Sequence, residues 1–171
     1  MKQAPQIETP ASRPIVPLGV VKITEDIDTP TIWIGNKVYV IKQWDFHTNS
    51  QLSIEPGAVI KFHHEEGPVL TVTDKAAIIA KGVSDKPIVF ASYKDDSCGG
   101  DSYGDQKNSS PKPGDWNGVY IEESGSVFDH CRFYYGGPDK VLEVWNSSVS
   151  VTNTTFAYNL GSALDLSKAT I

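Results

Sequence analysis

The sequence predicts an all-β protein of the parallel β-helix type, and two observations support this prediction. Apolar residues recur at every second position in short runs, and Gly, Pro, Asn or Asp separate these runs. The C-terminal part of the chain also repeats itself every 22 to 23 residues. The runs that we expect to form strands are, in order, 37–41, 52–54, 59–62, 69–72, 76–80, 87–90, 118–121, 141–144, 149–151 and 164–166.

The repeat becomes visible when residues 118–137 are aligned with residues 141–160 at an offset of 23. The aligned pairs are Val119 with Leu142, Ile121 with Val144, Phe128 with Val151, Phe133 with Phe156, and Tyr135 with Tyr158. A third copy starts at Leu164, at an offset of 22. This unit is too short for a βαβ motif and fits one coil of a β-helix, in which like residues stack about 4.8 Å apart. Leucine-rich repeats have a similar period and are the alternative, although their fixed Leu and Asn pattern is absent.

The chain divides into a linker and one domain. Residues 1–17 contain four prolines among polar residues, a composition typical of an extended linker, and residues 18–171 form the predicted solenoid. We expect a secretion signal or anchor to be missing from this chain. The final residues, 167–171, continue a strand pattern within an unfinished coil, so we expect a C-terminal truncation. An uncapped solenoid end exposes strand edges, which predicts self-association through that end.

The composition argues against two classes of partner. With 15 basic and 21 acidic residues the formal charge is −6, and no Lys/Arg cluster is present, so we expect no binding of nucleic acid. No apolar run approaches the length of roughly 18 to 20 residues that a membrane span requires.

Five phrases of the chain occur in an order that resembles bacterial surface and secreted proteins with right-handed, pectate-lyase-like parallel β-helix repeats. The phrases are Trp33, YVI (39–41), LSIEPGAVIKF (52–62), AKGVSDKPIVFAS (80–92) and PGDWNGVYI (113–121). The resemblance implies a right-handed parallel β-helix in an exported protein, with an extracellular or cell-surface location. We expect a non-catalytic module with a carbohydrate-binding or adhesive role. The alternative is a fragment of a polysaccharide lyase or glycoside hydrolase, because such solenoids serve all of these functions.

An acidic, glycine-rich loop, residues 93–116, interrupts the strand pattern, and we expect it to be extruded from one corner of the solenoid. Ca²⁺ takes six to eight oxygen ligands and needs a tightly bent chain to supply them. Related proteins carry a similar loop, and DSYGDQ (101–106) is similar to its calcium-binding phrase. The predicted calcium ligands are Asp95, Asp96, Asp101 and Asp105, whereas Asp115 is expected to be a turn residue that bonds to its own backbone.

Two further sets of residues are candidates for chemistry or binding. Glu143 and Asp165 align at an offset of 22 and are expected to lie about 5 Å apart on an outer face, as in a retaining glycosidase. No Arg or Lys stands in that column, and acids are common on exposed strands, so we expect no catalytic residues. Tyr134 and Trp145 occupy positions that alternate away from the core, and Tyr103 lies in the acidic loop; these three aromatic residues are the candidates for stacking on sugar rings.

The two cysteines, Cys98 and Cys131, leave two possibilities open. They can form one disulfide, or they can be a loop thiol and a small buried apolar residue, because their spacing does not decide between these.

Overall fold

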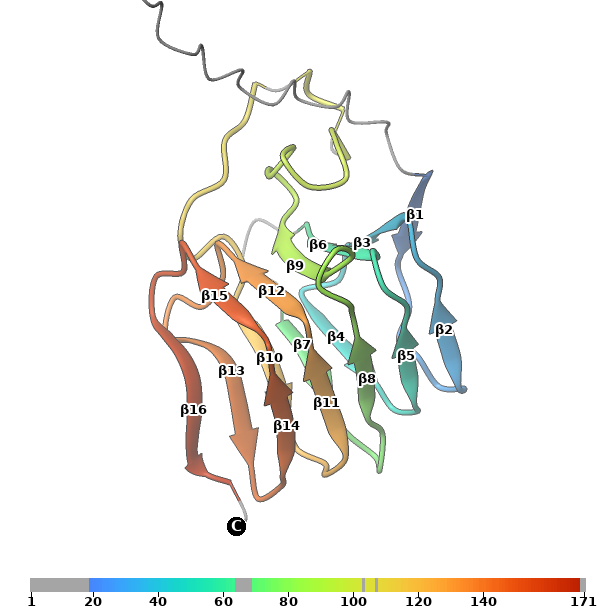
Figure 1. Ribbon diagram of the computed structural model, residues 1–171, viewed down its shortest axis with the longest axis vertical. Helices are drawn as coiled ribbons and strands as arrows, with labels where there is room; N and C mark the ends of the chain where they lie inside the picture. Colours follow the sequence, from blue (N-terminus) through green and yellow to red (C-terminus); the bar gives the residue numbers. More distant parts are fainter. Residues whose placement is uncertain (1–18, 64–68, 103, 107, 170–171) are drawn as a thin grey trace, which may run out of the picture.

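The computed structural model describes residues 19–63, 69–102, 104–106 and 108–169, so the predicted linker 1–17 and Tyr103 lie outside the described residues. The described residues form sixteen β-strands and no helix, and therefore contain no helix able to cross a membrane. Parallel pairing joins the strands into three sheets (Figure 1). The structure is thus all-β, as predicted.

The three sheets are named A, B and C. In spatial order, sheet A contains β1 (Gly19–Ile23), β3 (Lys37–Ile41), β6 (Val59–Phe62), β9 (Ile88–Ser92), β12 (Cys131–Tyr134) and β15 (Thr155–Ala157). Sheet B contains β16 (Ser162–Lys168), β13 (Lys140–Trp145), β10 (Gly118–Ile121), β7 (Val69–Val72) and β4 (Asp45–Thr48). Sheet C contains β14 (Val149–Thr152), β11 (Ser126–Asp129), β8 (Ile78–Lys81), β5 (Leu52–Ile54) and β2 (Thr31–Trp33).

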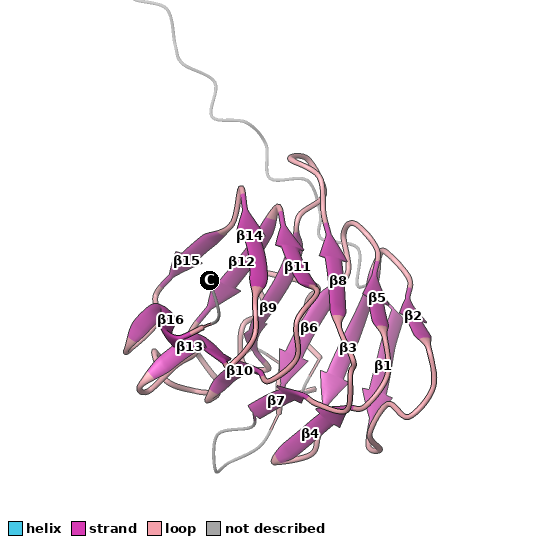
Figure 2. Cartoon of the chain, turned by 90° about the horizontal axis from the view of Figure 1, so that it is seen from below, coloured by secondary structure: helices cyan, strands magenta, loops and turns pink. Residues whose placement is uncertain are grey.

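From β2 onward, consecutive strands belong to sheets C, A and B in turn. Each strand pairs in parallel with the strand that comes three places later in the chain. Figure 2 shows the same order from below, with the strands of sheet C side by side. This arrangement is compatible with a parallel β-helix.

The strand register confirms the repeat that the sequence predicted. Val119 pairs with Leu142 and Phe133 pairs with Phe156, 23 positions later in each case, whereas Leu142 pairs with Leu164, 22 positions later. The period does not hold throughout. Val38 pairs with Val59, only 21 positions on, and the acidic loop lengthens the step between β9 and β12.

Aromatic stacking fills much of the interior. The Phe133 ring lies between Phe90 and Phe156, with centroid distances of 4.6 and 4.9 Å and nearly parallel planes, which confirms the predicted internal stack. Trp116 stacks on Phe62 at 4.2 Å in the same core. Because stacked rings on successive strands repeat the strand spacing, each ring fixes the register of its neighbours.

The C-terminal end of the stack is less well covered than its middle. Strands β14, β15 and β16 are each the last strand of their sheet (Figure 2). The apolar side chains that these strands turn toward the core are only partly buried: Val149, Val151, Phe156 and Leu164. This end therefore presents strand edges next to incompletely covered apolar side chains.

Candidate functional site

The acidic loop lies over the outer face of sheet A, above β9 in Figure 1. That face carries a second apolar cluster, which consists of Val38, Val40, Val59, Val89 and Ala91 and against which Cys98 and Tyr134 pack. A Cβ atom at Gly99 would lie 2.5 Å from Val38 Cγ2, and the φ of Gly99 is +71°, so the chain needs glycine there. The expectation of an extruded loop is therefore corrected in part: the segment around Cys98 packs on the sheet, because outward-facing valines require a cover.

Lys61 is the residue on which this part of the loop rests. It occupies an outward position of β6, is fully buried, and donates from Nζ to the carbonyl oxygen of Gly100 at 2.7 Å. Burial lowers the pKa of Lys61, while the negative charges of Asp96, Asp95 and Asp101 act in the opposite direction. Sequence analysis missed this residue, although a single cation in the otherwise apolar run VIKF was a usable signal.

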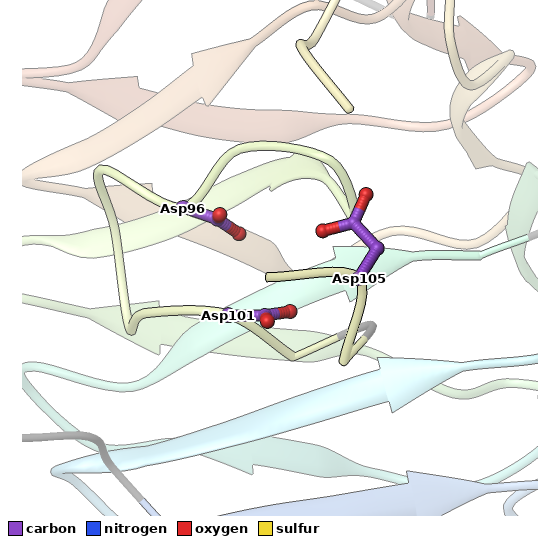
Figure 3. A group of neighbouring side chains, drawn as sticks. All are labelled: Asp96, Asp101 and Asp105. Carbon is purple, nitrogen blue, oxygen red and sulfur yellow. The ribbon is translucent and has the colours of Figure 1, made fainter. Parts of the chain in front are cut away.

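Three of the four predicted calcium ligands come together. One carboxylate oxygen from each of Asp96, Asp101 and Asp105 lies within 4.8 Å of the others (Figure 3), a grouping that could hold a metal ion. Asp95 is not part of this group. It is buried and accepts hydrogen bonds from the backbone nitrogen of Ser97 at 3.0 Å and from Ser97 Oγ at 2.6 Å. Asp95 therefore shapes the turn before the acidic group.

Asp115 fastens the two ends of the loop to each other. Its carboxylate accepts hydrogen bonds from Ser92 Oγ at 2.7 Å, from the backbone nitrogen of Lys112 at 3.0 Å and from Lys94 Nζ at 3.3 Å. The bond from Lys112 confirms the predicted turn role.

The two cysteines do not pair. Cys98 lies in the apolar cluster on the outer face of sheet A, and Cys131 lies in the interior core, so both thiols are free. Burial raises the pKa of each thiol to about 12, and Asp95 and Asp129, respectively, add to this effect. Both side chains therefore behave as small apolar residues at neutral pH.

A polar ladder runs across the outer face of sheet B. It consists of residues that the strand register places side by side, namely His47, Thr71, Tyr120, Glu143 and Asp165. At about 4.8 Å per strand the ladder is about 19 Å long. The predicted alignment of Glu143 with Asp165 is confirmed by this register.

Lys140 joins the two carboxylates of this ladder, a contact that the sequence alignment did not reveal. Its Nζ lies 2.8 Å from Glu143 Oε1 and 3.0 Å from Asp165 Oδ2. Hydrogen bonds from Lys140, first to Glu143 and then to Asp165, raise its pKa above the usual value, so that the ammonium remains charged. No described residue of this column is Lys or Arg, but Lys140, on the same strand as Glu143, reaches both of its carboxylates.

The other end of the ladder forms a pocket of about 370 Å³. Its lining residues are Trp44, Asp45, His47, Val69, Thr71, Asn117, Tyr120 and Glu122. The indole of Trp44 is 52% exposed at this pocket. Sequence analysis missed the pocket, because Trp44 directly precedes β4, Glu122 directly follows β10, and only the register of β4, β7 and β10 brings them to one face.

The residues predicted to stack on sugar rings do not form one platform. Tyr134 lies on sheet A, where its ring contacts Tyr135 and Tyr158 edge-on, at centroid distances of 6.4 and 6.0 Å. Trp145 ends β13 on sheet B and is exposed. Tyr103 is outside the described residues.

Comparison of the chain with protein-family models, with curated proteins and with solved structures found no match.

Proposed function

We propose that this chain is a right-handed parallel β-helix module of an exported bacterial surface protein, and that it binds carbohydrate on the outer face of sheet B. The regular passage of the chain through sheets C, A and B supports the fold, since parallel crossovers are overwhelmingly right-handed. An extracellular location and an adhesive role belong to the same proposal.

The pocket beside Trp44 carries the functional part of the proposal. An exposed indole next to a row of hydroxyl, amide and carboxylate groups offers an apolar face and several hydrogen-bonding partners, which is the combination that sugar rings require. Its volume of about 370 Å³ lies within the range of small-ligand sites. The ladder continues beyond the pocket toward Glu143, so an extended glycan can follow it.

We propose binding rather than cleavage. A retaining pair needs one carboxylic acid to protonate the leaving oxygen and one carboxylate as the nucleophile. Here Lys140 Nζ contacts both Glu143 and Asp165, so the same ammonium group pairs with both side chains of the candidate pair. Incubation with acidic and neutral glycans should give retention without new reducing or unsaturated ends, and release of such ends would favour the lyase or hydrolase alternative.

Replacement of Trp44 by alanine should abolish most of the glycan binding. The variant loses the stacking face while the strands behind it are unaffected, so calorimetric titration should show an affinity at least tenfold weaker than that of the unmodified protein. Tyr158→Ala is the matched control, because Tyr158 is an exposed aromatic residue next to sheet A. Equal affinities for all three proteins would contradict this assignment of the site.

Calcium is proposed as a stabiliser of the acidic loop. A site filled at about 100 times its Kd adds about 2.7 kcal/mol to the free energy of unfolding, which corresponds to an increase in Tm of about 5–10 °C. Thermal unfolding in calcium and in a chelator should show this difference, and the double variant Asp101→Asn, Asp105→Asn should lose it. Asp74→Asn with Asp85→Asn, two exposed aspartates outside the loop, is the control. Coincident unfolding curves for the unmodified protein would exclude a calcium role.

Self-association through the C-terminal end is also proposed. The edges of β14, β15 and β16 and their partly buried apolar side chains can pair with a second copy of the chain. Sedimentation velocity should show a species larger than the monomer as the concentration rises. Leu166→Lys places a charge on an exposed position of β16 and should weaken association. A strict monomer at high concentration would refute the proposal.

A further inference from the structure

The carboxylates at the Trp44 pocket indicate which glycans it accepts. Asp45 and Glu122 line the pocket, and none of the described residues that line it is Lys or Arg. Among the described lining residues, His47 is the one with a basic side chain, and its Nε2 lies 3.1 Å from Asp45 Oδ1. The whole chain has a formal charge of −6. A polyanionic glycan would therefore meet repulsion both at the site and from the protein as a whole.

The two acidic residues come from different strands, because Asp45 begins β4 and Glu122 directly follows β10. The register places Asp45 next to Val69 and, one strand further, Gly118, while Glu122 follows Gly118 by four residues. For regular strand spacing this separates the Cα atoms of Asp45 and Glu122 by about 16 Å. An oligomer with a cation on successive units can pair with each carboxylate separately.

Aromatic rings add a second attraction for a cation. The exposed Trp44 face and the Tyr120 ring line the same pocket. A cation within about 6 Å of an aromatic ring centre is attracted by the ring quadrupole, most strongly at Trp. The same ring also provides the apolar face on which a sugar ring stacks.

From this charge complementarity we propose that the pocket binds a cationic, aminated glycan, that is, an oligomer of hexosamine units with free amino groups. This inference rests on the proposed carbohydrate-binding function and narrows its ligand. It excludes uronate polymers, which carry the opposite charge, as the preferred ligand.

The test compares three oligomers of equal length by calorimetric titration: a β-1,4-linked glucosamine tetramer, its fully N-acetylated form, and a galacturonate tetramer. The first two differ at the amino groups, so charge is the principal variable. We expect the glucosamine tetramer to bind at least tenfold more tightly than the acetylated form and the galacturonate tetramer to bind least. Raising the salt concentration should reduce this preference, because exposed charges are screened.

Variants separate the inference from the function on which it rests. Glu122→Gln and Asp45→Asn should each weaken binding of the glucosamine tetramer several-fold more than binding of the acetylated tetramer, whereas Trp44→Ala should weaken both to a similar extent. Equal binding of the first two tetramers would overturn the cationic preference and leave carbohydrate binding intact. Absence of binding by all three would overturn the proposed binding of these glycans together with the preference.

Discussion

Replacement of Trp116 by alanine is expected to lower the free energy of unfolding by about 3–5 kcal/mol, the range for deleting a large buried aromatic side chain. Trp116 is fully buried and stacks on Phe62 at 4.2 Å with an interplanar angle of 4°. Its Nε1 donates to the carbonyl oxygen of Tyr134 at 2.9 Å. The surroundings cannot close readily on the cavity, because the aromatic stacks on either side are fixed by strand register.

Two further variants identify the cause of this effect. Trp116→Phe keeps a ring against Phe62 and loses the donor to Tyr134, so it should cost about 1 kcal/mol plus a small packing loss. Trp145→Ala is the control for the same substitution at a partly exposed Trp and should lower stability by clearly less than Trp116→Ala. Denaturant unfolding at constant m-value measures all three differences. A Trp116→Ala variant as stable as Trp145→Ala would contradict the described packing.

Replacement of Lys61 by glutamate is expected to destabilise the protein by about 3–5 kcal/mol, because it buries an uncompensated charge. The new carboxylate would lie under the loop, where Asp95, Asp96 and Asp101 already act on the Lys61 ammonium. It would also face the carbonyl oxygen of Gly100 without a proton to donate. Thermal unfolding should show a Tm lower by about 10 °C.

Lys61→Met is the informative comparison, since it keeps the apolar stem and removes the charge. The pKa of Lys61 is lowered by burial, which means that the charged form is already disfavoured at this position. The Met variant loses the hydrogen bond to Gly100, which destabilises it, but it also avoids the cost of burying a charge, which stabilises it. We therefore expect the free energy of unfolding of Lys61→Met to remain within about 1 kcal/mol of that of the unmodified protein. Lys42→Glu, at an exposed lysine, controls for charge reversal alone. Equal stability of the Met and Glu variants at position 61 would show that the loop does not bury this position.

The strands that were predictable were those with a short run rich in β-branched and aromatic residues. The runs at 37–41 and 59–62 correspond to β3 and β6, because Val, Ile, Tyr and Phe favour strands and both faces of these two strands are buried. Strand β4 was not predicted, since Phe46 is its only large apolar side chain between polar neighbours. The β conformation of such a strand depends more on pairing with its neighbours in the sheet than on the strand propensity of its own residues.

The contacts of the acidic loop could be predicted from the sequence only in part. The acidic residues themselves pointed to a cation site, and three of the four named aspartates do lie together. That Asp95 instead shapes a turn, and that Lys61 lies beneath the loop, depends on how residues 93–102 fold onto a sheet built from distant segments. Nothing within the loop sequence specifies that sheet.

The sequence by itself determined the all-β class, the repeat of 22 to 23 residues and the aromatic stack of Phe133 on Phe156. These features depend on which residues alternate and recur along the chain, and periodicity is a local property. Only the tertiary structure decided which side chains share a face: the pocket of Trp44 with Glu122 and the contact of Lys140 with Asp165. These residues lie on or next to different strands of sheet B, and a shift of one residue in strand register would turn each of them to the other side of the sheet.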